Sequence, residues 1–178
     1  VLRVWSDILR RVPESRLFLK ADIFSEDDAR AEVLERIAAA GIPTSRVDAE
    51  GNSPDYLAAY NRMDIALDPF PYPGGGTTCD ALYMGVPVVT LSGETLGSRF
   101  GASLLVNIGA EALVAHTEEE YISLAVSLAG DIQTLEALHT GLRGMLAQSP
   151  VMDAAGYGAA VGAAYEQVWS IYEQHSEQ

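Results

Sequence analysis

The sequence predicts an α/β fold, in which a parallel β-sheet is covered by helices on both faces and followed by a helical tail. Three observations predict it. Short apolar runs of strand length alternate with longer segments whose apolar residues recur at helical spacing. Within residues 64–92, one such run leads through a glycine-rich turn into a helical pattern and a second run. Beyond residue 110 only helical patterns occur. Alternating strands and helices build a parallel sheet with crossover helices.

The composition is that of a globular chain with a substantial core. The 178 residues are 48% hydrophobic, and we expect a single domain over residues 1–178. No apolar run approaches the roughly 20 residues that cross a bilayer, and the first residues form neither a secretory nor a transit signal. One cysteine, Cys79, excludes an internal disulfide framework and a cysteine-rich zinc site. We therefore expect a cytoplasmic protein with no membrane partner.

The charge is strongly acidic. The formal net charge is -14 and the isoelectric point is about 4.4. This balance argues against a nucleic acid partner, because phosphate backbones bind basic surfaces. Any phosphate group that binds here must be held locally, by backbone N–H groups and a few cations.

The first predicted elements are a helix and a strand. Residues 1–12 have apolar side chains at helical spacing, and Pro13 ends the helix. The chain opens inside this pattern without an initiator Met, so we expect it to be a fragment of a longer protein. Residues 16–20 form a short apolar strand. Lys20 lies at its carboxyl end, where open α/β sheets bind ligands, although a solvated strand end explains a lysine equally well.

A second helix and strand follow. Residues 25–40 form a helix with Ser25 as its N-cap and acidic residues in its first turn. Residues 46–49 form a weak strand that ends in a loop. A short helix is predicted for residues 55–63, and it places Tyr56 near that loop. The Tyr56 ring either stacks on a base or packs as an ordinary surface tyrosine.

The most informative stretch begins with a strand at residues 65–67 and a proline-rich elbow. Three glycines at positions 74–76 and two threonines, Thr77 and Thr78, precede a helix predicted for residues 79–84. A helix start has unpaired backbone N–H groups and a positive dipole end, and glycines let an anion approach the backbone closely. The turn therefore suits a phosphate or a diphosphate.

Asp80 lies in the first turn of that helix, and a second buried strand follows at residues 87–91. A carboxylate at this place can accept hydrogen bonds from paired sugar hydroxyls, as an acidic residue does in dinucleotide-binding folds. An ordinary structural explanation stays open, with glycines as a flexible loop, threonine as an N-cap and Asp80 as a favourable first-turn charge.

The rest of the chain is predicted to be helical. A loop at residues 93–99 enters a helix that ends near residue 105, and Arg99 either pairs with an acidic neighbour such as Glu94 or faces an anionic ligand. The further predicted helices span residues 110–115, 117–129, 132–146 and 153–174. Three glycines in the last helix suggest close packing against another element. The histidines lie on separate segments without ligand spacing, so we assign no metal site.

These segments together resemble a known enzyme family. The C-terminal catalytic half of the O-GlcNAc transferases contains segments similar to DIALDPFPYPGGGTTCDALYMGVPVVTL and GETLGSR of this chain. The bacterial tetratricopeptide-linked members and their SPINDLY-like relatives are the most similar. The resemblance runs from WSDILRRVPESRLFLK to the closing YEQVW, so it covers essentially the whole chain. It implies the C-terminal Rossmann-like domain of a GT-B glycosyltransferase, which holds the nucleotide of a sugar donor without a metal or other cofactor.

The resemblance also implies donor-binding roles for particular residues. The residues matched at the diphosphate are Gly75, Gly76, Thr77 and Thr78. The residues matched to the loop whose backbone reads the uracil edge are Gly51, Asn52 and Ser53. Asp80 matches the acidic residue that binds the ribose hydroxyls. Two positions depart from the family, because Tyr56 replaces a histidine of many members and Ser53 replaces a lysine of some. No catalytic residue is assigned.

The implied reaction of the intact protein transfers a sugar, N-acetylglucosamine by this resemblance, from a UDP donor to a protein Ser or Thr hydroxyl with inversion. In the family, protein acceptors are bound by regions upstream of the segment matched here, and a lysine that contacts the donor diphosphate also lies there. We therefore expect this chain to be inactive alone. Two alternatives remain, a different sugar-transfer enzyme on the same fold and a non-catalytic protein-interaction module.

Overall fold

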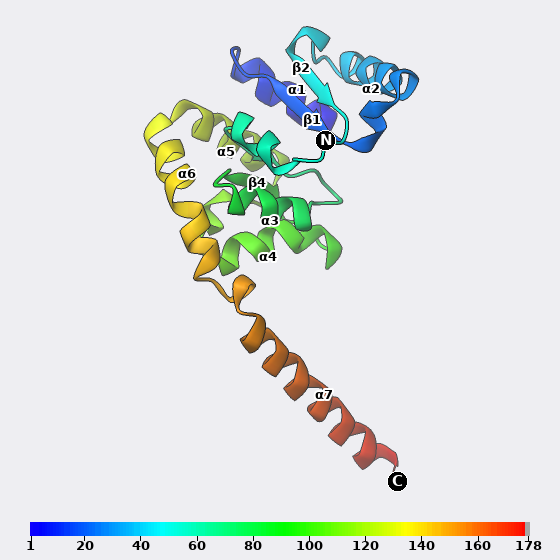
Figure 1. Cartoon of the computed structure of the whole chain (residues 1–178), viewed down its shortest axis with the longest axis vertical. Helices are drawn as coiled ribbons and strands as arrows, with labels where there is room; N and C mark the ends of the chain where they lie inside the picture. Colours follow the sequence, from blue (N-terminus) through cyan, green and yellow to red (C-terminus); the bar gives the residue numbers. More distant parts are fainter. Residues whose placement is uncertain (177–178) are drawn as a thin grey trace.

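The structure is a computed structural model, which describes residues 1–176 and is shown in Figure 1. Its strands are β1 (Leu17–Lys20), β2 (Val47–Glu50), β3 (Ala66–Leu67), β4 (Val88–Leu91) and β5 (Val114–Ala115). Its α-helices are α1 (Leu2–Arg11), α2 (Asp27–Ala39), α3 (Gly76–Tyr83), α4 (Phe100–Asn107), α5 (Glu118–Gly130), α6 (Ile132–Ala147) and α7 (Ala154–Ser176). Its 3₁₀ turns are η1 (Asp22–Ser25), η2 (Thr44–Arg46), η3 (Leu57–Arg62), η4 (Gly97–Arg99), η5 (Glu111–Leu113) and η6 (Pro150–Met152).

The strands are all parallel, which confirms the predicted α/β class, but they form two separate ladders rather than one sheet. β1 pairs with β2 from Leu17 opposite Val47 to Lys20 opposite Glu50. The second ladder has the order β3-β4-β5. Among residues 1–176 no ladder hydrogen bonds join β1 to β3, so the described strands pair as one two-stranded and one three-stranded parallel ladder.

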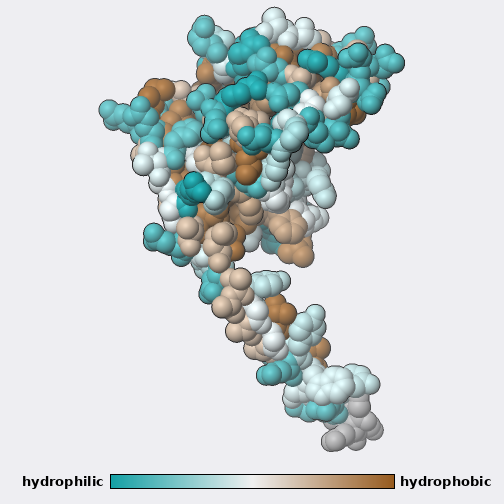
Figure 2. All heavy atoms as spheres, in the orientation of Figure 1, coloured by the Kyte–Doolittle hydropathy of each residue, from teal (hydrophilic) through white to brown (hydrophobic). Residues whose placement is uncertain are grey.

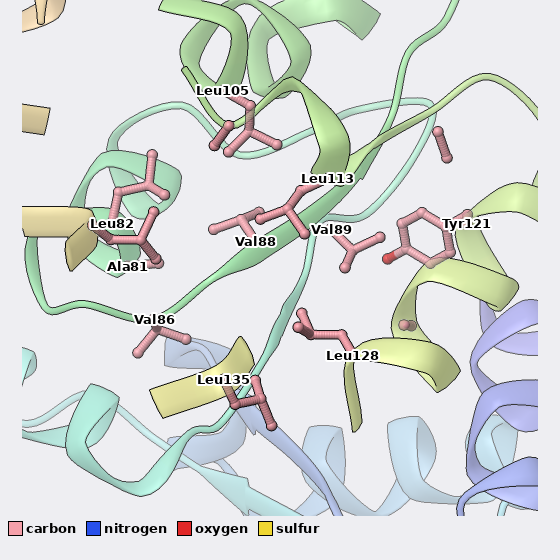
Figure 3. Packing of buried hydrophobic residues seen from close by; sticks show 14 of the residues in the cluster. Ala81, Leu82, Val86, Val88, Val89, Leu105, Leu113, Tyr121, Leu128 and Leu135 are labelled. Carbon is pink, nitrogen blue, oxygen red and sulfur yellow. The ribbon is translucent and has the colours of Figure 1, made fainter. Parts of the chain in front are cut away.

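The main core surrounds β4. Val88 and Val89 are 1% and 0% exposed, and consecutive strand residues point to opposite faces, so both faces of β4 are covered. Helices α3, α4 and α5 all contact this strand. In Figure 3, Val89 lies on the side of Tyr121 and Val88 lies nearer Leu82. This arrangement confirms the predicted helical cover on both faces.

A smaller core supports the first ladder. Its buried members are Leu9, Leu17, Ile37 and Ile42. They come from α1, β1, α2 and the turn after α2, so this cluster packs α1 and the crossover helix α2 against β1. Helix α1 also contacts α5, which in turn contacts β4, so α1 links the first ladder to the second.

Several predicted boundaries differ from the structure. Helix α2 has Glu26 as its N-cap, without a side-chain cap bond, and Ser25 instead ends the preceding η1 turn. The segment predicted as a helix at 110–115 contains the short η5 turn and then β5. Val114 lies in β5 because it pairs with Thr90 of β4, a long-range contact that a pattern of six residues does not reveal.

Helix α7 runs away from the rest of the molecule in Figure 1. Large apolar side chains of this helix are exposed, including Tyr157, Tyr165 and Trp169, and Figure 2 shows apolar residues along its visible side. The predicted close packing of its glycines against another element is wrong for the residues described. A Cβ at Gly158 or Gly162 would meet nothing within 4 Å, and the nearest atoms to one at Gly156 belong to Asp153, directly before the helix. Within residues 1–176, no helix is both long and apolar enough to cross a membrane.

Candidate functional site

The connection between β3 and α3 is held in place by Asp68. Asp68 directly follows β3 and is 4% exposed. One carboxylate oxygen accepts the Gly74 N–H at 2.7 Å, and the other accepts the Thr90 hydroxyl of β4 at 2.7 Å. The pKa of the Asp68 carboxyl is raised above its ordinary value, because burial outweighs the bonds from Thr90 and Gly74, which lower it. The glycine-rich turn is therefore fastened to the sheet on the side that faces the core.

Helix α3 begins earlier than predicted, at Gly76 rather than Cys79. Its first backbone bond runs from the Cys79 N–H to the Gly75 carbonyl at 3.1 Å. The N–H groups of Gly76, Thr77 and Thr78 consequently precede the ladder and have no partner within the helix. They are concentrated at the positive end of the helix dipole, where an anion is stabilised.

The three glycines of the turn have different surroundings. A Cβ built on Gly74 would lie 2.6 Å from the hydroxyl oxygens of both Thr77 and Thr78. Gly74 is therefore required by its neighbours, and both threonine hydroxyls lie against it. A Cβ on Gly75 or Gly76 would meet nothing within 4 Å. Open space thus borders the turn beside the free N–H groups of α3.

Tyr60 was not identified from the sequence, although it lies on the same predicted helix as Tyr56. Its hydroxyl donates to the Thr77 carbonyl at 3.2 Å. Burial first, then the charge of Asp80, and then Tyr56 raise the pKa of Tyr60 to about 12. Tyr56 itself is 48% exposed. The structure therefore brings Tyr56, Asp80 and Thr77 together around Tyr60.

The loop of Gly51, Asn52 and Ser53 follows β2 and is held by other residues. Lys20 donates from Nζ to the Gly51 carbonyl at 2.7 Å and to Oε1 of Glu50 at 2.8 Å. Asn52 donates to an Asp22 carboxylate oxygen at 3.1 Å. Lys20 is thus not a solvated strand end, because its side chain is 13% exposed and paired with Glu50.

The η3 turn connects the two parts of the site. On one side, Arg62 pairs with Oε2 of Glu50 at 2.6 Å and lies 4.5 Å from the centre of the Phe18 ring. On the other side, Tyr60 bonds to α3. The Gly51–Ser53 loop and the α3 start are therefore linked through one short segment. The Lys20 bond first, and then the Arg62 bond, hold the pKa of Glu50 below its ordinary value.

Two other expectations concern cations and metals. Arg99 is exposed, and the ion pair with Glu94 that the sequence suggested is not formed among residues 1–176. In the same part of the chain, no three His, Cys, Asp or Glu side chains gather closely enough to hold a metal ion.

Comparison with known proteins identifies a family and relatives that this chain resembles. The family model described as Glycosyl transferase family 41 matches residues 1–161. The "Probable UDP-N-acetylglucosamine--peptide N-acetylglucosaminyltransferase SPINDLY" of Oryza sativa subsp. japonica is 43% identical over 175 residues, which make up 97% of this chain and 19% of that protein. The "UDP-N-acetylglucosamine--peptide N-acetylglucosaminyltransferase" of Caenorhabditis elegans is 30% identical over 97% of this chain and 15% of that protein.

A solved structure is similar as well. A mutant O-GlcNAc transferase from Thermobaculum terrenum superposes with a TM-score of 0.89 and 36% sequence identity, over 94% of this chain and 33% of that one. The chain thus spans about a fifth of the length of the rice relative and a third of the solved neighbour.

Proposed function

Because the chain belongs to glycosyltransferase family 41, we propose that it forms the donor-binding part of an inverting glycosyltransferase. The proposed donor is UDP-N-acetylglucosamine, and the proposed acceptors are Ser and Thr side chains of proteins. One observation carries the proposal, the start of α3, where N–H groups outside the helix ladder lie beside the open space at Gly75 and Gly76.

In the proposed complex, the diphosphate lies at the start of α3. It accepts hydrogen bonds from backbone N–H groups there and from the Thr77 hydroxyl. Asp80, half-buried in the first turns of α3, accepts bonds from the ribose hydroxyls. The backbone of Gly51, Asn52 and Ser53 binds the uracil edge, and Tyr56 stacks on the nucleotide. The contacts of η3 with both β2 and α3 support this division of roles.

The proposed chemistry is a single displacement. The acceptor hydroxyl oxygen forms a bond to the anomeric carbon on the face opposite the leaving group, which inverts that carbon. The bond between this carbon and the diphosphate oxygen breaks, and UDP departs with the electron pair. The start of α3 stabilises the charge that develops on UDP, and removal of one such donor typically costs a few kcal/mol of transition-state stabilisation. The hydroxyl proton passes to a base that we do not assign to residues 1–176.

Three further features belong to this proposal. The donor diphosphate is stabilised by N–H and O–H groups, so we propose that binding requires no metal ion. Protein acceptors bind to parts of a family-length protein that lie outside this segment. The segment alone does not catalyse sugar transfer. The protein acts in the cytoplasm.

Calorimetric titration of UDP and of ADP into this chain tests the donor site. We expect saturable binding of UDP but not of ADP, weakened about tenfold or more by Asp80→Ala and by Thr77→Ala. Matched controls are Asp131→Ala and Thr117→Ala, which remove side-chain caps from the starts of α6 and α5. Each control lowers stability by about 1 kcal/mol and leaves the UDP affinity unchanged.

The outcomes separate the three functions considered. Preference for UDP-N-acetylglucosamine over other UDP-sugars supports the proposed donor, and preference for a different sugar indicates another transferase on the same fold. Absence of UDP binding, both in this chain and in a protein of family length that contains it, contradicts the transferase function and favours a protein-interaction module.

A further inference from the structure

Asp68 is a buried carboxylate that has no assigned role in the proposed function. It is 4% exposed, and removal of a carboxylate from water is costly unless hydrogen bonds compensate. Neither of its side-chain partners is a cation, since they are the Gly74 N–H and the Thr90 hydroxyl. A residue kept charged or polar at such a position needs a specific reason, because an apolar residue would fill the space at lower cost.

The place of Asp68 supplies that reason. Its carboxylate touches the turn before α3 through Gly74 and touches β4 through Thr90, each at 2.7 Å. Its backbone carbonyl accepts the Tyr121 hydroxyl of α5 at 3.0 Å. A Cβ built on Gly101, in the first turn of α4, would lie 2.2 Å from Oδ2 of Asp68. Four elements therefore meet at this residue, and the carboxylate has little room to move.

The bond to Gly74 acts directly on the proposed diphosphate site. Gly74 is the residue against which the Thr77 and Thr78 hydroxyls lie. A fixed Gly74 amide therefore determines where the turn, both hydroxyls and the first N–H groups of α3 are placed. If this bond is lost, the partly buried N–H of Gly74 must bind water instead, and the turn has to shift outward.

We propose that Asp68 is a positioning residue for donor binding, which holds residues 74–78 in the conformation that accepts the diphosphate. It touches no substrate itself. The inference rests on the proposed function of the α3 start as the diphosphate site. It goes beyond that function because it assigns the preorganisation of the site to one buried side chain.

Three substitutions test the proposal. Asp68→Ala removes both acceptors. Asp68→Asn keeps an oxygen for the Gly74 N–H, and the Thr90 hydroxyl can rotate to accept from the new amide group. Asp68→Leu fills the space without providing an acceptor, and it replaces Asp68→Ala in the test if the alanine variant does not fold. Ser149→Ala is the control, because it removes a different buried hydroxyl, bonded to Leu146, far along the chain.

Two measurements are made on the folded chain, UDP affinity by calorimetry and amide hydrogen exchange of residues 74–78 without ligand. We expect Asp68→Ala, or Asp68→Leu, to weaken UDP binding about tenfold or more and to speed exchange at these amides. We expect Asp68→Asn to restore both readouts to within a few-fold of wild type. Ser149→Ala lowers the melting temperature and changes neither readout.

The inference is overturned if the alanine and leucine variants lose stability as Ser149→Ala does, yet keep wild-type affinity and exchange at residues 74–78. Loss of affinity that Asp68→Asn does not restore also overturns it. Failure of the proposed function looks different. In that case the wild-type chain binds no UDP, whereas the exchange measurement still reports whether Asp68 holds the turn.

Discussion

The Tyr60 hydroxyl donates a hydrogen bond to the Thr77 carbonyl at 3.2 Å. This contact ties the η3 turn, which follows the proposed uracil loop, to the first turn of α3. The same η3 turn pairs with Glu50 through Arg62. Two loops from different parallel ladders are thereby held at one site, and the following predictions concern the residues that hold them.

We predict that Tyr60→Phe weakens UDP binding a few-fold and lowers stability by about 1 kcal/mol, because one hydrogen bond to the backbone of α3 is lost. Calorimetry and thermal denaturation measure the two effects. Tyr83→Phe is a matched control, since Tyr83 ends the same helix and bonds to Arg143 instead. An equal loss of UDP affinity in both variants would mean that Tyr60 has no particular role at the site.

We predict that Gly76→Ala makes the chain more stable but weakens UDP binding. Gly76 is the first residue of α3 and has open space around it, so alanine gains part of the roughly 0.5–1 kcal/mol by which it is favoured over glycine inside a helix. The added methyl group occupies space that a phosphate needs.

Gly141→Ala is the control for Gly76→Ala. Gly141 lies inside α6, also in open space, and its replacement should raise stability without any change in UDP affinity. Unchanged UDP affinity in Gly76→Ala would argue against a diphosphate at the start of α3.

We predict that Lys20→Met weakens UDP binding several-fold, because the Gly51 carbonyl and Glu50 both lose the Lys20 ammonium group. Calorimetric titration with UDP measures the change. Arg16→Met is the control, since Arg16 forms an exposed ion pair with Asp48 on the same ladder but makes no bond to Gly51. A larger loss of affinity in Arg16→Met than in Lys20→Met would contradict the assignment of the loop.

We predict a pH dependence for the Glu50 pair. The hydrogen bonds from Lys20 and then Arg62 lower the folded pKa of Glu50 below its ordinary value of 4.5. A lowered folded pKa stabilises the protein above the unfolded pKa, and this stabilisation is lost as pH falls through the folded pKa. The difference in melting temperature between wild type and Glu50→Gln should therefore be largest near neutral pH and shrink below pH 4.5.

Melting temperatures recorded from neutral pH down to about pH 3, below the ordinary range of glutamate, test this dependence. Glu173→Gln on α7 controls for the change in net charge. A temperature difference that stays constant over the whole range would show that the ion pairs of Glu50 do not stabilise the fold.

Much of the fold could be predicted because its signals are local. The order of helices and strands follows from apolar spacing, and the glycine-rich turn before α3 is visible in the residues themselves. The sequence predicts the start of α3 three residues late, at Cys79 instead of Gly76, because consecutive glycines have low helix propensity and are typical of loops. The sequence predicts a helix where the two-residue strand β5 lies, because the pairing of β5 with β4 is a long-range contact that no local pattern reveals.

The sequence by itself determined the α/β class and the family resemblance. It also determined that glycines, two threonines and an aspartate gather at the start of one helix, α3. Only the tertiary structure decided how these residues are supported. Lys20 meets Glu50 across 30 positions, Tyr60 meets Thr77 across 17 and Asp68 meets Thr90 across 22. Periodicity and propensity act over a few residues, whereas these contacts depend on which elements the packed core brings together.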